Sequence, residues 1–334
     1  MLVTLLFLGS AAAIYLACEY FVNGVEWCGQ RLNLGSTAVG TVLAAFGTAL
    51  PESAVTFVAV VFGQTPQQKD IGVGAAMGGP LVLATVAYAV VGVALLLNRR
   101  NLGRDTSKLT VDHHRLSKDQ GAFLSIFLVK VTLGLVAFSF KPWLGVLFLA
   151  AYAFYVRTEL TSTEKPSDDE SLEPLKITPH AADPTLKWAL LQTTLALVVI
   201  AIASHTFVDQ LETIGHLFHW APHVVALLLS PVATELPEIM NALIWVRQGK
   251  ENLALANISG AMMIQATIPS ALGIFFTPWL FDAPLIASAI ATIGAIVYLW
   301  MSFRSGPVDA RRLVPAGLFY LAFAGFVAYH FFVR

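Results

Sequence analysis

The sequence predicts an all-α polytopic membrane protein in which ten transmembrane helices form two inverted five-helix repeats. Three observations predict this fold class. Of the 334 residues, 57% are hydrophobic and 12% are charged, about half the charged share of a typical soluble domain. The charges cluster between apolar runs long enough to cross a bilayer core of about 30 Å. A six-residue motif also occurs twice, each time inside an apolar run.

The breaks between apolar runs predict five spans on each side of the longest polar interval. The first repeat, residues 1–158, is predicted to hold spans 2–28, 36–63, 71–97, 120–139 and 142–158. The second repeat, residues 186–334, is predicted to hold spans 186–214, 222–246, 252–276, 283–303 and 312–332. Residues 159–185 are rich in Glu, Asp, Ser and Pro, which predicts an acidic linker too short for a regulatory domain.

The positive charges predict how the spans are oriented. Sixteen of the twenty Lys and Arg residues lie in or at the edges of the loops after the first, third, fifth, seventh and ninth spans. Because cytoplasmic loops carry such an excess, these loops and the central linker are expected in the cytoplasm. Both termini are then expected outside the cell (inner) membrane. Five spans per repeat is an odd number, so the second repeat must cross the membrane in the opposite sense.

The repeated motif is Thr-Ala-Leu-Pro-Glu-Ser at 48–53, in the motif helix 36–63, and Thr-Glu-Leu-Pro-Glu-Ile at 234–239, in the motif helix 222–246. A carboxylate in hydrocarbon is costly, and a proline inside a helix leaves backbone carbonyls without donors. Two such copies in inverted helices favour a shared ion site near mid-membrane over two structural glutamates.

The side chains of the motif predict an all-oxygen ligand set. Thr48 and Glu52 are four residues apart and share a helix face, as do Thr234 and Glu238. Two carboxylates, two hydroxyls and the freed carbonyls suit a hard cation such as Ca²⁺, which takes about six to eight oxygen ligands. No Cys or His lies near either motif, so a soft metal is not indicated.

The sequence at this point resembles the sodium/calcium exchanger family of the cation/Ca²⁺ antiporter superfamily. That family carries Gly-Thr-Ser-Leu-Pro-Glu in each of two repeats, against Gly-Thr-Ala-Leu-Pro-Glu at 47–52 and Ala-Thr-Glu-Leu-Pro-Glu at 233–238 here. The resemblance covers about 36–90 and 222–276 and extends to the ten-span plan. It implies that the transported cation is bound by Glu52, Glu238, Thr48, Thr234 and carbonyls near Ala45 and Pro231.

Several positions depart from the family pattern. The motif serines fall on Ala49 and Glu235. The Gly-Ser pairs of the third and eighth spans fall on 78–79 and 260–261, which are Gly-Gly and Gly-Ala, and the polar Asn or Asp one turn beyond falls on Leu83 and Gln265. Most side-chain oxygens that would bind several Na⁺ ions are therefore missing. The family's exchange of three Na⁺ for one Ca²⁺ is not supported by these residues.

Glu235 points to another coupling ion. It precedes Glu238 by three residues, near enough on a helix to interact. Like charges in a low dielectric raise each other's pKa, so one of Glu52, Glu235 and Glu238 is expected to hold a proton when no cation is bound. The hypothesis is proton coupling; the alternative is that Glu235 faces a water-filled vestibule or pairs with a cation.

The function implied is secondary active antiport of a divalent cation, Ca²⁺ first, against Na⁺ or H⁺ by alternating access. The alternatives are an antiporter for Mn²⁺ or Mg²⁺, an intramembrane hydrolase and a non-transporting cation sensor. No enzyme activity and no cofactor are expected. The expected partners are the lipid bilayer and small inorganic cations, with no nucleic acid.

Other polar residues in or beside the spans have simpler explanations. Four acids near span ends favour solvated positions over an ion path or pairing with Lys130; they are Glu19, Glu26, Asp209 and Glu212. His216, His219 and His223 have a spacing that could gather three imidazoles. Pro222 interrupts their helix face, so whether they form an accessory site stays open.

Overall fold

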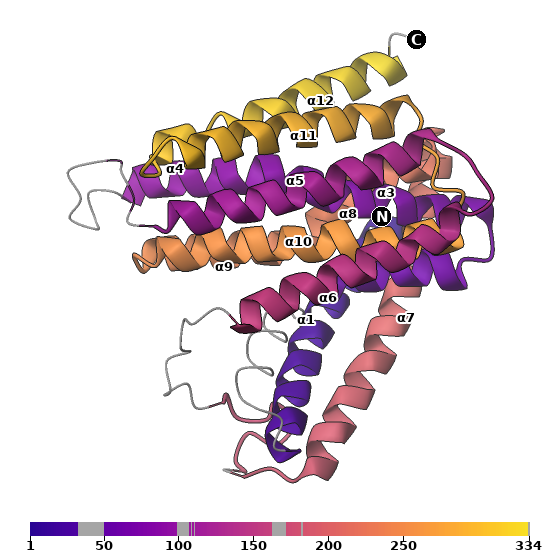
Figure 1. Ribbon diagram of the computed structural model, residues 1–334. Coiled ribbons are helices and arrows are strands. Elements are labelled where there is room, and N and C mark those ends of the chain that lie inside the picture. The colour runs from indigo at the N-terminus through magenta and orange to yellow at the C-terminus, as the bar shows by residue number, and fades with distance from the viewer. Residues whose placement is uncertain are drawn as a thin grey trace.

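The computed structural model is helical throughout the part of the chain that it describes, which is residues 1–32, 50–98, 107, 109, 111–161, 172–181 and 183–332. No strand occurs among these residues. Most helices lie side by side in one bundle, and α1 and α7 form a pair that projects from the side of this bundle at a steep angle (Figure 1).

The helices follow the predicted spans closely. In the first half they are α1 (Leu2–Arg31), a helical stretch at 50–57 that continues into the π-helical turn η1 (Val58–Phe62), α3 (Pro66–Val82), η2 (Leu83–Ala87), α4 (Tyr88–Asn98), α5 (His113–Leu135), η3 (Lys141–Leu144) and α6 (Gly145–Thr161). In the second half they are α7 (Leu186–Phe218), α8 (Pro222–Thr234), α9 (Leu236–Arg247), α10 (Glu251–Phe276), α11 (Ala283–Arg304), η4 (Ala310–Arg312) and α12 (Ala316–Phe332).

Seven helical segments in the described residues are long and apolar enough to cross a membrane. They are Leu2–Arg31, Pro66–Asn98, Leu186–Phe218, Pro222–Arg247, Glu251–Phe276, Ala283–Arg304 and Ala310–His330. Of the other three predicted spans, 36–63 is described only from residue 50, and α5 and α6 are helical without meeting the same criteria. The chain is therefore a multi-pass helical membrane protein.

Polar residues at the helix starts explain where several helices begin. The Thr65 side chain accepts the N–H of Gln68 at 3.1 Å and starts α3, with a proline in the first turn. Asp112 starts α5 by accepting the N–H groups of Arg115 and His114, each at 3.0 Å. These backbone donors hold the pKa of Asp112 below its usual value.

Glycines on α3 let it lie against α8. The Gly74 Cα faces the carbonyl of His223, and that of Gly78 faces the carbonyl of Leu227 and the ring of Pro231. A side chain at either position would collide with α8, so close approach of the two helices depends on glycine there. The glycines of the third predicted span thus serve the packing of α3 against α8.

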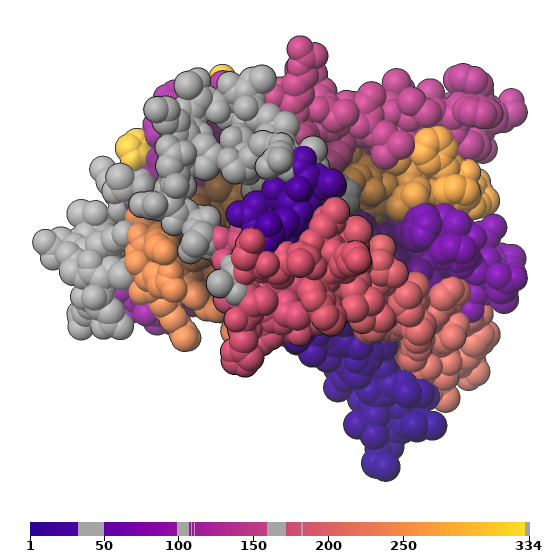
Figure 2. Space-filling view, turned by 90° about the horizontal axis from the view of Figure 1, so that it is seen from below, coloured from indigo at the N-terminus to yellow at the C-terminus, as the bar shows by residue number. Residues whose placement is uncertain are grey.

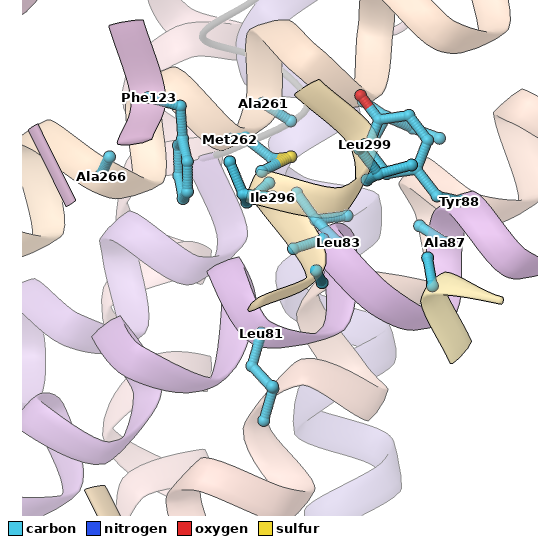
Figure 3. Packing of buried hydrophobic residues seen from close by; sticks show 14 of the residues in the cluster. Leu81, Leu83, Ala87, Tyr88, Phe123, Ala261, Met262, Ala266, Ile296 and Leu299 are labelled. Atoms are coloured by element: carbon cyan, nitrogen blue, oxygen red, sulfur yellow. The ribbon is translucent and has the colours of Figure 1, made fainter. Parts of the chain in front are cut away.

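The largest hydrophobic cluster joins α3, η2 and α4 to α5, α10, α11 and α12. Figure 3 shows part of it, with Leu83, Met262 and Ile296 among fully buried neighbours. A second cluster joins α1, α7 and α8 to the helix at 50–62. The α1–α7 pair thus packs on the side of the bundle that carries both motif helices.

The outward faces of α1 and α7 are apolar and exposed. They include Leu5, Leu8, Leu195 and Ile202. Figure 2 looks onto this side, where α7 crosses the middle of the view and atoms of α1 appear on either side of it. A broad apolar face of this kind fits contact with lipid, because water would make it unfavourable.

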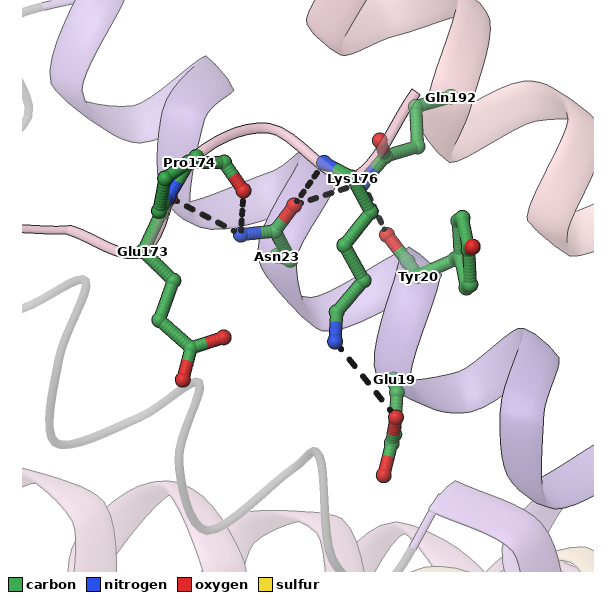
Figure 4. A network of polar contacts seen from close by, with 7 residues as sticks. All are labelled: Glu19, Tyr20, Asn23, Glu173, Pro174, Lys176 and Gln192. Atoms are coloured by element: carbon green, nitrogen blue, oxygen red, sulfur yellow. Dashed lines mark hydrogen bonds and ion pairs between the residues drawn. The ribbon is translucent and has the colours of Figure 1, made fainter. Parts of the chain in front are cut away.

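The described end of the predicted linker is bound between α1 and α7 (Figure 4). Asn23 of α1 donates to the carbonyl of Glu173 at 3.3 Å and accepts the N–H of Lys176 at 3.1 Å. Gln192 of α7 donates to Asn23 at 2.9 Å. Lys176 also pairs with Glu19 at 3.6 Å, so the partner of Glu19 is in the linker. Sequence reasoning did not single out Asn23 as a contact for the linker.

Candidate functional site

The first motif carboxylate lies deep in the protein. Glu52, in the helical stretch at 50–57, is 1% exposed, and neither of its oxygens receives a hydrogen bond from another described residue. Gly79 of α3 lies directly against this carboxylate, and a Cβ on Gly79 would collide with it. The glycine therefore makes room for the carboxylate between the two helices.

The second motif breaks its helix. The predicted span 222–246 consists of α8 and α9, with Glu235 alone between them. The N–H of Glu235 donates to the carbonyl of Pro231 at 2.9 Å. Pro237 stands in the first turn of α9, where a missing N–H is tolerated, and it leaves the carbonyl of Ala233 without a donor four residues later. The proline thus sets the break at the motif.

Glu235 is held at this break by two neutral donors. Its carboxylate accepts the Thr234 hydroxyl at 2.9 Å and the Gln265 amide of α10 at 2.6 Å. All three side chains are at most 3% exposed. The structure therefore brings together three of the residues that the sequence singled out, from two motif positions and the eighth predicted span.

Glu238 lies on the first turn of α9 and is fully buried. Its oxygens, like those of Glu52, receive no hydrogen bond from another described residue. The carboxyl groups of Glu52 and Glu238 each interact electrostatically with that of Glu235, and Glu238 also interacts with Tyr15 and Cys18 of α1. Three buried carboxyl groups thus meet where both motif helices approach α3, α10 and α1.

A buried lysine stands beside this cluster. Lys130 of α5 is 0% exposed, and its ammonium donates to the carbonyl of Ala76 on α3 at 2.8 Å. It also interacts electrostatically with Glu52. Sequence reasoning missed this link, although a signal existed. Pro80 lies four residues after Ala76 and cannot donate to its carbonyl, which leaves that oxygen free for a donor from another helix.

The remaining predicted residues have mixed outcomes. Thr48 and Ala45 lie outside the described residues, so their part in the site stays a prediction. Pro231 is buried in α8, and one lone pair of its carbonyl is used by Glu235. Its predicted part as a cation ligand would have to use the other lone pair.

No group of three or more His, Cys, Asp or Glu side chains among the described residues has the geometry to hold a metal ion. This holds for the three histidines with suggestive spacing and also for Glu52, Glu235 and Glu238 as they are placed here. His216 and His219 are exposed, while His223 bonds Asp282 at the start of α11 at 2.7 Å. Asp209 and Glu212 of α7 instead accept hydrogen bonds from Gln68 and Thr65 beside the start of α3.

The fold and the buried carboxylates define a multi-pass helical membrane protein with a polar centre. The family model described as "Sodium/calcium exchanger protein" matches residues 2–160 and 188–332. The chain therefore belongs to the sodium/calcium exchanger family, as its motifs predicted.

Relatives match over nearly the whole chain. "Inner membrane protein YrbG" of Escherichia coli (strain K12) is 24% identical over 314 residues, covering 92% of this chain and 90% of the relative. "Putative antiporter CaxA" of Alkalimonas amylolytica is 25% identical over 314 residues, covering 93% of this chain and 92% of the relative.

Solved structures share the fold. The H⁺/Ca²⁺ exchanger CAX superimposes with a TM-score of 0.74 at 16% identity, over 96% of this chain and 82% of that one. The sodium-calcium exchanger NCX_Mj superimposes with a TM-score of 0.57 at 17% identity, over 97% of this chain and 98% of that one. At sequence identities this low, the likeness shows only that the fold is shared.

Proposed function

We propose that this protein exchanges a divalent cation, Ca²⁺, for protons across the membrane by alternating access. The observation that carries the proposal is the buried group of Glu52, Glu235 and Glu238, in which two carboxyl groups receive no hydrogen bond from another described residue. Buried carboxylates without donors are costly, and a bound cation or a proton relieves that cost.

The three acids have different parts in this proposal. Glu52 and Glu238 are the main ligands, because their oxygens are not used by the protein. Thr234 and Gln265 supply further oxygens, and Thr48 with the carbonyls near Ala45 and Pro231 completes the set. Such a set of oxygens suits Ca²⁺. Mn²⁺ and Mg²⁺ share this preference, so competition experiments must separate the three ions.

Protons are proposed as the coupling ion because of what surrounds the acids. Positions that would supply further oxygens for Na⁺ are Gly79 and Leu83, which have none to offer. Three carboxylates close together at low dielectric cannot all stay ionised without a cation. Protons that enter when Ca²⁺ leaves, and leave when Ca²⁺ enters, would produce antiport at one shared site.

The proposed architecture is that of ten spans in two inverted repeats, 1–158 and 186–334, joined by the cytoplasmic linker 159–185, with both termini outside the inner membrane. The likeness to CAX and NCX_Mj over most of the chain supports this arrangement. The pair α1 and α7 would be the moving element, since it packs against the motif helices and α1 reaches Glu238. The chain would then be a transporter and not an enzyme.

Uptake of ⁴⁵Ca²⁺ into proteoliposomes tests the proposal. An outward proton gradient should drive uptake into vesicles of the wild-type protein, and a Na⁺ gradient at constant pH should not. Glu238→Gln should lower uptake about 100-fold, because one anionic ligand is lost. Unlabelled Mn²⁺ and Mg²⁺ added in excess identify the preferred ion. Uptake driven by Na⁺ alone, or none by either gradient, would contradict the proposal.

Glu235→Gln tests the proton-binding part separately. Ca²⁺ affinity of the detergent-solubilised wild type should fall as pH falls, because protons compete for the same carboxylates. The Gln variant has one fewer such group, so its affinity should depend less steeply on pH. An identical pH dependence in both proteins would remove Glu235 from the coupling step while leaving Glu52 and Glu238 as ligands.

A further inference from the structure

An apolar groove runs between the last turns of α4 and α9, away from the motif acids. It has a volume of about 360 Å³, and apolar side chains of both helices form its walls, among them Val93, Leu97 and Leu243. Val93 and Leu97 are 43% and 76% exposed, so the groove opens on the outer surface of the bundle. Its two polar linings, Asn98 and Arg247, are the last residues of the two helices.

The groove has the length and position of one membrane leaflet. Both helices belong to segments long and apolar enough to cross a membrane, Pro66–Asn98 and Pro222–Arg247, and both segments end at the groove, on the same side of the bundle (Figure 1). The α4 lining from Ala89 to Asn98 is about 14 Å of helix. One leaflet contributes about 15 Å to the hydrocarbon core. The apolar walls therefore match an acyl chain, and the polar end lies at the level of lipid headgroups.

The polar end carries a positive charge that no described acid neutralises. Arg247 is exposed, and no described carboxylate is within ion-pair distance of its guanidinium. The nearest acid along the chain, Glu251, is buried in the first turn of α10 and does not line the groove. The amide of Asn98 donates back to the carbonyl of Ala94 at 2.9 Å. Arg247 is thus the charged donor that the groove offers to a ligand.

This combination of apolar walls and a guanidinium selects an anionic phospholipid. Lipid chains are as apolar as leucine, so apolar walls alone do not distinguish one lipid from another. Selectivity must come from the charged end, where a guanidinium matches a phosphate with two parallel hydrogen bonds. The loops after α4 and α9 are also among those whose positive charges predict a cytoplasmic position, and the cytoplasmic leaflet carries anionic lipids.

We propose that the groove between α4 and α9 binds one anionic phospholipid, with an acyl chain along Val93, Leu97 and Leu243 and the headgroup phosphate on Arg247. The lipid would join the ends of two helices that lead to the motif acids. α4 continues from α3 through η2, and α9 begins with the turn that holds Glu238. The groove shares no residue with the cation site, and lipid binding there does not depend on the exchange of Ca²⁺ for protons.

Native mass spectrometry of the delipidated, detergent-solubilised protein tests the site. Phosphatidylglycerol and phosphatidylcholine with identical chains are titrated separately. The wild type should bind one phosphatidylglycerol about fivefold more tightly than one phosphatidylcholine, because an Arg near the membrane surface is worth about 1 kcal/mol with an anionic lipid. Arg247→Gln should bind both lipids equally, and Arg247→Lys should keep most of the preference. Equal affinity of the wild type for the two lipids would overturn the proposal.

Arg304→Gln is the matched control for charge. Arg304 is also exposed and also ends a membrane-crossing segment, Ala283–Arg304, but it lies over the Trp300 ring and does not line the groove. Its loss should leave the preference for phosphatidylglycerol unchanged. An equal loss of preference in Arg304→Gln and Arg247→Gln would show that surface charge in general attracts the lipid, and the groove would have no part in it.

Val93→Trp is the matched variant for the groove, because it fills the space without changing the charge. It should weaken the binding of both lipids, and unchanged binding would contradict an acyl chain in the groove. The same mass spectra report the oligomeric state. A dimer without bound lipid that Val93→Trp converts to a monomer would show that a second copy of the chain covers the groove, and would overturn the proposal.

Thermal unfolding separates lipid binding from a structural part of Arg247. An arginine in the last turn of a helix also stabilises the helix end. Phosphatidylglycerol should raise the unfolding temperature of the wild type, since it binds the folded state, and should not raise that of Arg247→Gln. A purely structural arginine would leave the lipid-dependent rise intact in the variant. If Arg247→Gln does not fold, the lipid preference of the wild type and the response of Val93→Trp decide the proposal.

Discussion

The two copies of the motif place their carboxylates in different electrostatic surroundings: both interact with Glu235, but only Glu52 also has a lysine nearby. In the first half, Glu52 has a buried ammonium, Lys130, about one helical turn away and no second acid on its own helix. In the second half, Glu238 has a second buried acid, Glu235, three residues away, and the Glu235 carboxylate accepts hydrogen bonds from two neutral donors, Thr234 and Gln265. The motif is repeated in the sequence, but the charged groups around its glutamate differ between the two halves.

The prolines of the two neighbouring helices show the same asymmetry. Pro80 of α3 frees the carbonyl of Ala76, which takes a charged donor at 2.8 Å from α5. Pro269 of α10 frees the carbonyl of Gln265, which has the Ser270 hydroxyl at 3.5 Å. The first contact is a short charge-assisted bond and the second is at the limit of a hydrogen bond. The proline-freed carbonyl of the first half thus accepts a lysine, whereas that of the second half has only a hydroxyl beside it.

The largest predicted effect tests this difference directly. Glu52→Gln and Glu238→Gln should both lower Ca²⁺ uptake about 100-fold, since each removes an anionic ligand. Their stabilities should differ. Glu52→Gln leaves Lys130 buried without its counter-charge, which should lower stability by about 2 kcal/mol, below the ~3–5 kcal/mol of a contacting buried pair. Both substitutions remove a like charge from Glu235, but Glu238→Gln leaves no buried lysine without a counter-charge and should not lower stability.

Thermal unfolding of the detergent-solubilised proteins measures the difference. Glu212→Gln is the control, because Glu212 is partly exposed and only accepts a hydrogen bond from Thr65 beside the start of α3. It should transport and unfold as wild type. Equal unfolding temperatures for Glu52→Gln and Glu238→Gln would mean that Lys130 does not depend on Glu52 as its counter-charge.

Glycine-to-alanine substitutions should have smaller effects on stability and Ca²⁺ affinity. They compare the packing of α3 in the first half with that of α10 in the second. A Cβ on Gly78 would meet the Leu227 carbonyl and the Pro231 ring at 2.7 Å each, and neither can move easily. Gly78→Ala should therefore lower stability by about 1–3 kcal/mol. Gly79→Ala pushes only the Glu52 carboxylate, so Ca²⁺ affinity should fall while stability changes by less than about 1 kcal/mol.

Gly260, aligned with Gly78 in sequence, provides the control in α10. Outside its own helix, no atom of the described structure lies within 4 Å of the place that a methyl group on Gly260 would take. Gly260→Ala should be neutral or stabilise the helix by up to about 1 kcal/mol. Unfolding temperature and Ca²⁺ titration separate the three variants. A loss of stability in Gly260→Ala equal to that in Gly78→Ala would show that the two helices are packed alike.

The sequence predicted the family, the helix positions and the burial of Glu52 and Glu238, because hydropathy and a repeated motif are local patterns. It left open whether Glu235 is buried or faces water. It also placed Gln265 near the motif through the resemblance. It did not predict which side chains on other helices reach the acids. The contact of Lys130 with Ala76 depends on how α5 is rotated against α3, which no local pattern encodes. A buried lysine together with a proline-freed carbonyl is a signal that could have been searched for.

The contact between Asp282 and His223 should give the smallest effect, because it joins the starts of α8 and α11 away from both motif acids. Burial alone would raise the pKa of Asp282, but the His223 hydrogen bond and the Leu285 N–H hold it below its usual value. Its contribution to stability is then present above the unfolded-state pKa of about 4 and is lost as pH falls through the lower folded-state value.

Two substitutions of Asp282 separate the stability due to the helix cap from that due to the charged contact with His223. Asp282→Ala removes the helix cap and the contact with His223, and should lower stability by about 1 kcal/mol. Asp282→Asn keeps a good cap and should lose only a few tenths of a kcal/mol at neutral pH. Unfolding temperatures at pH 7 and below pH 4 check both, since wild type and Asn variant should converge in acid. Because none of the three acids of the cation site interacts with Asp282, ⁴⁵Ca²⁺ uptake should be unchanged in both variants. A loss of uptake in Asp282→Asn would show that the pocket lined by Asp70, His223, Trp279 and Asp282 belongs to the ion path.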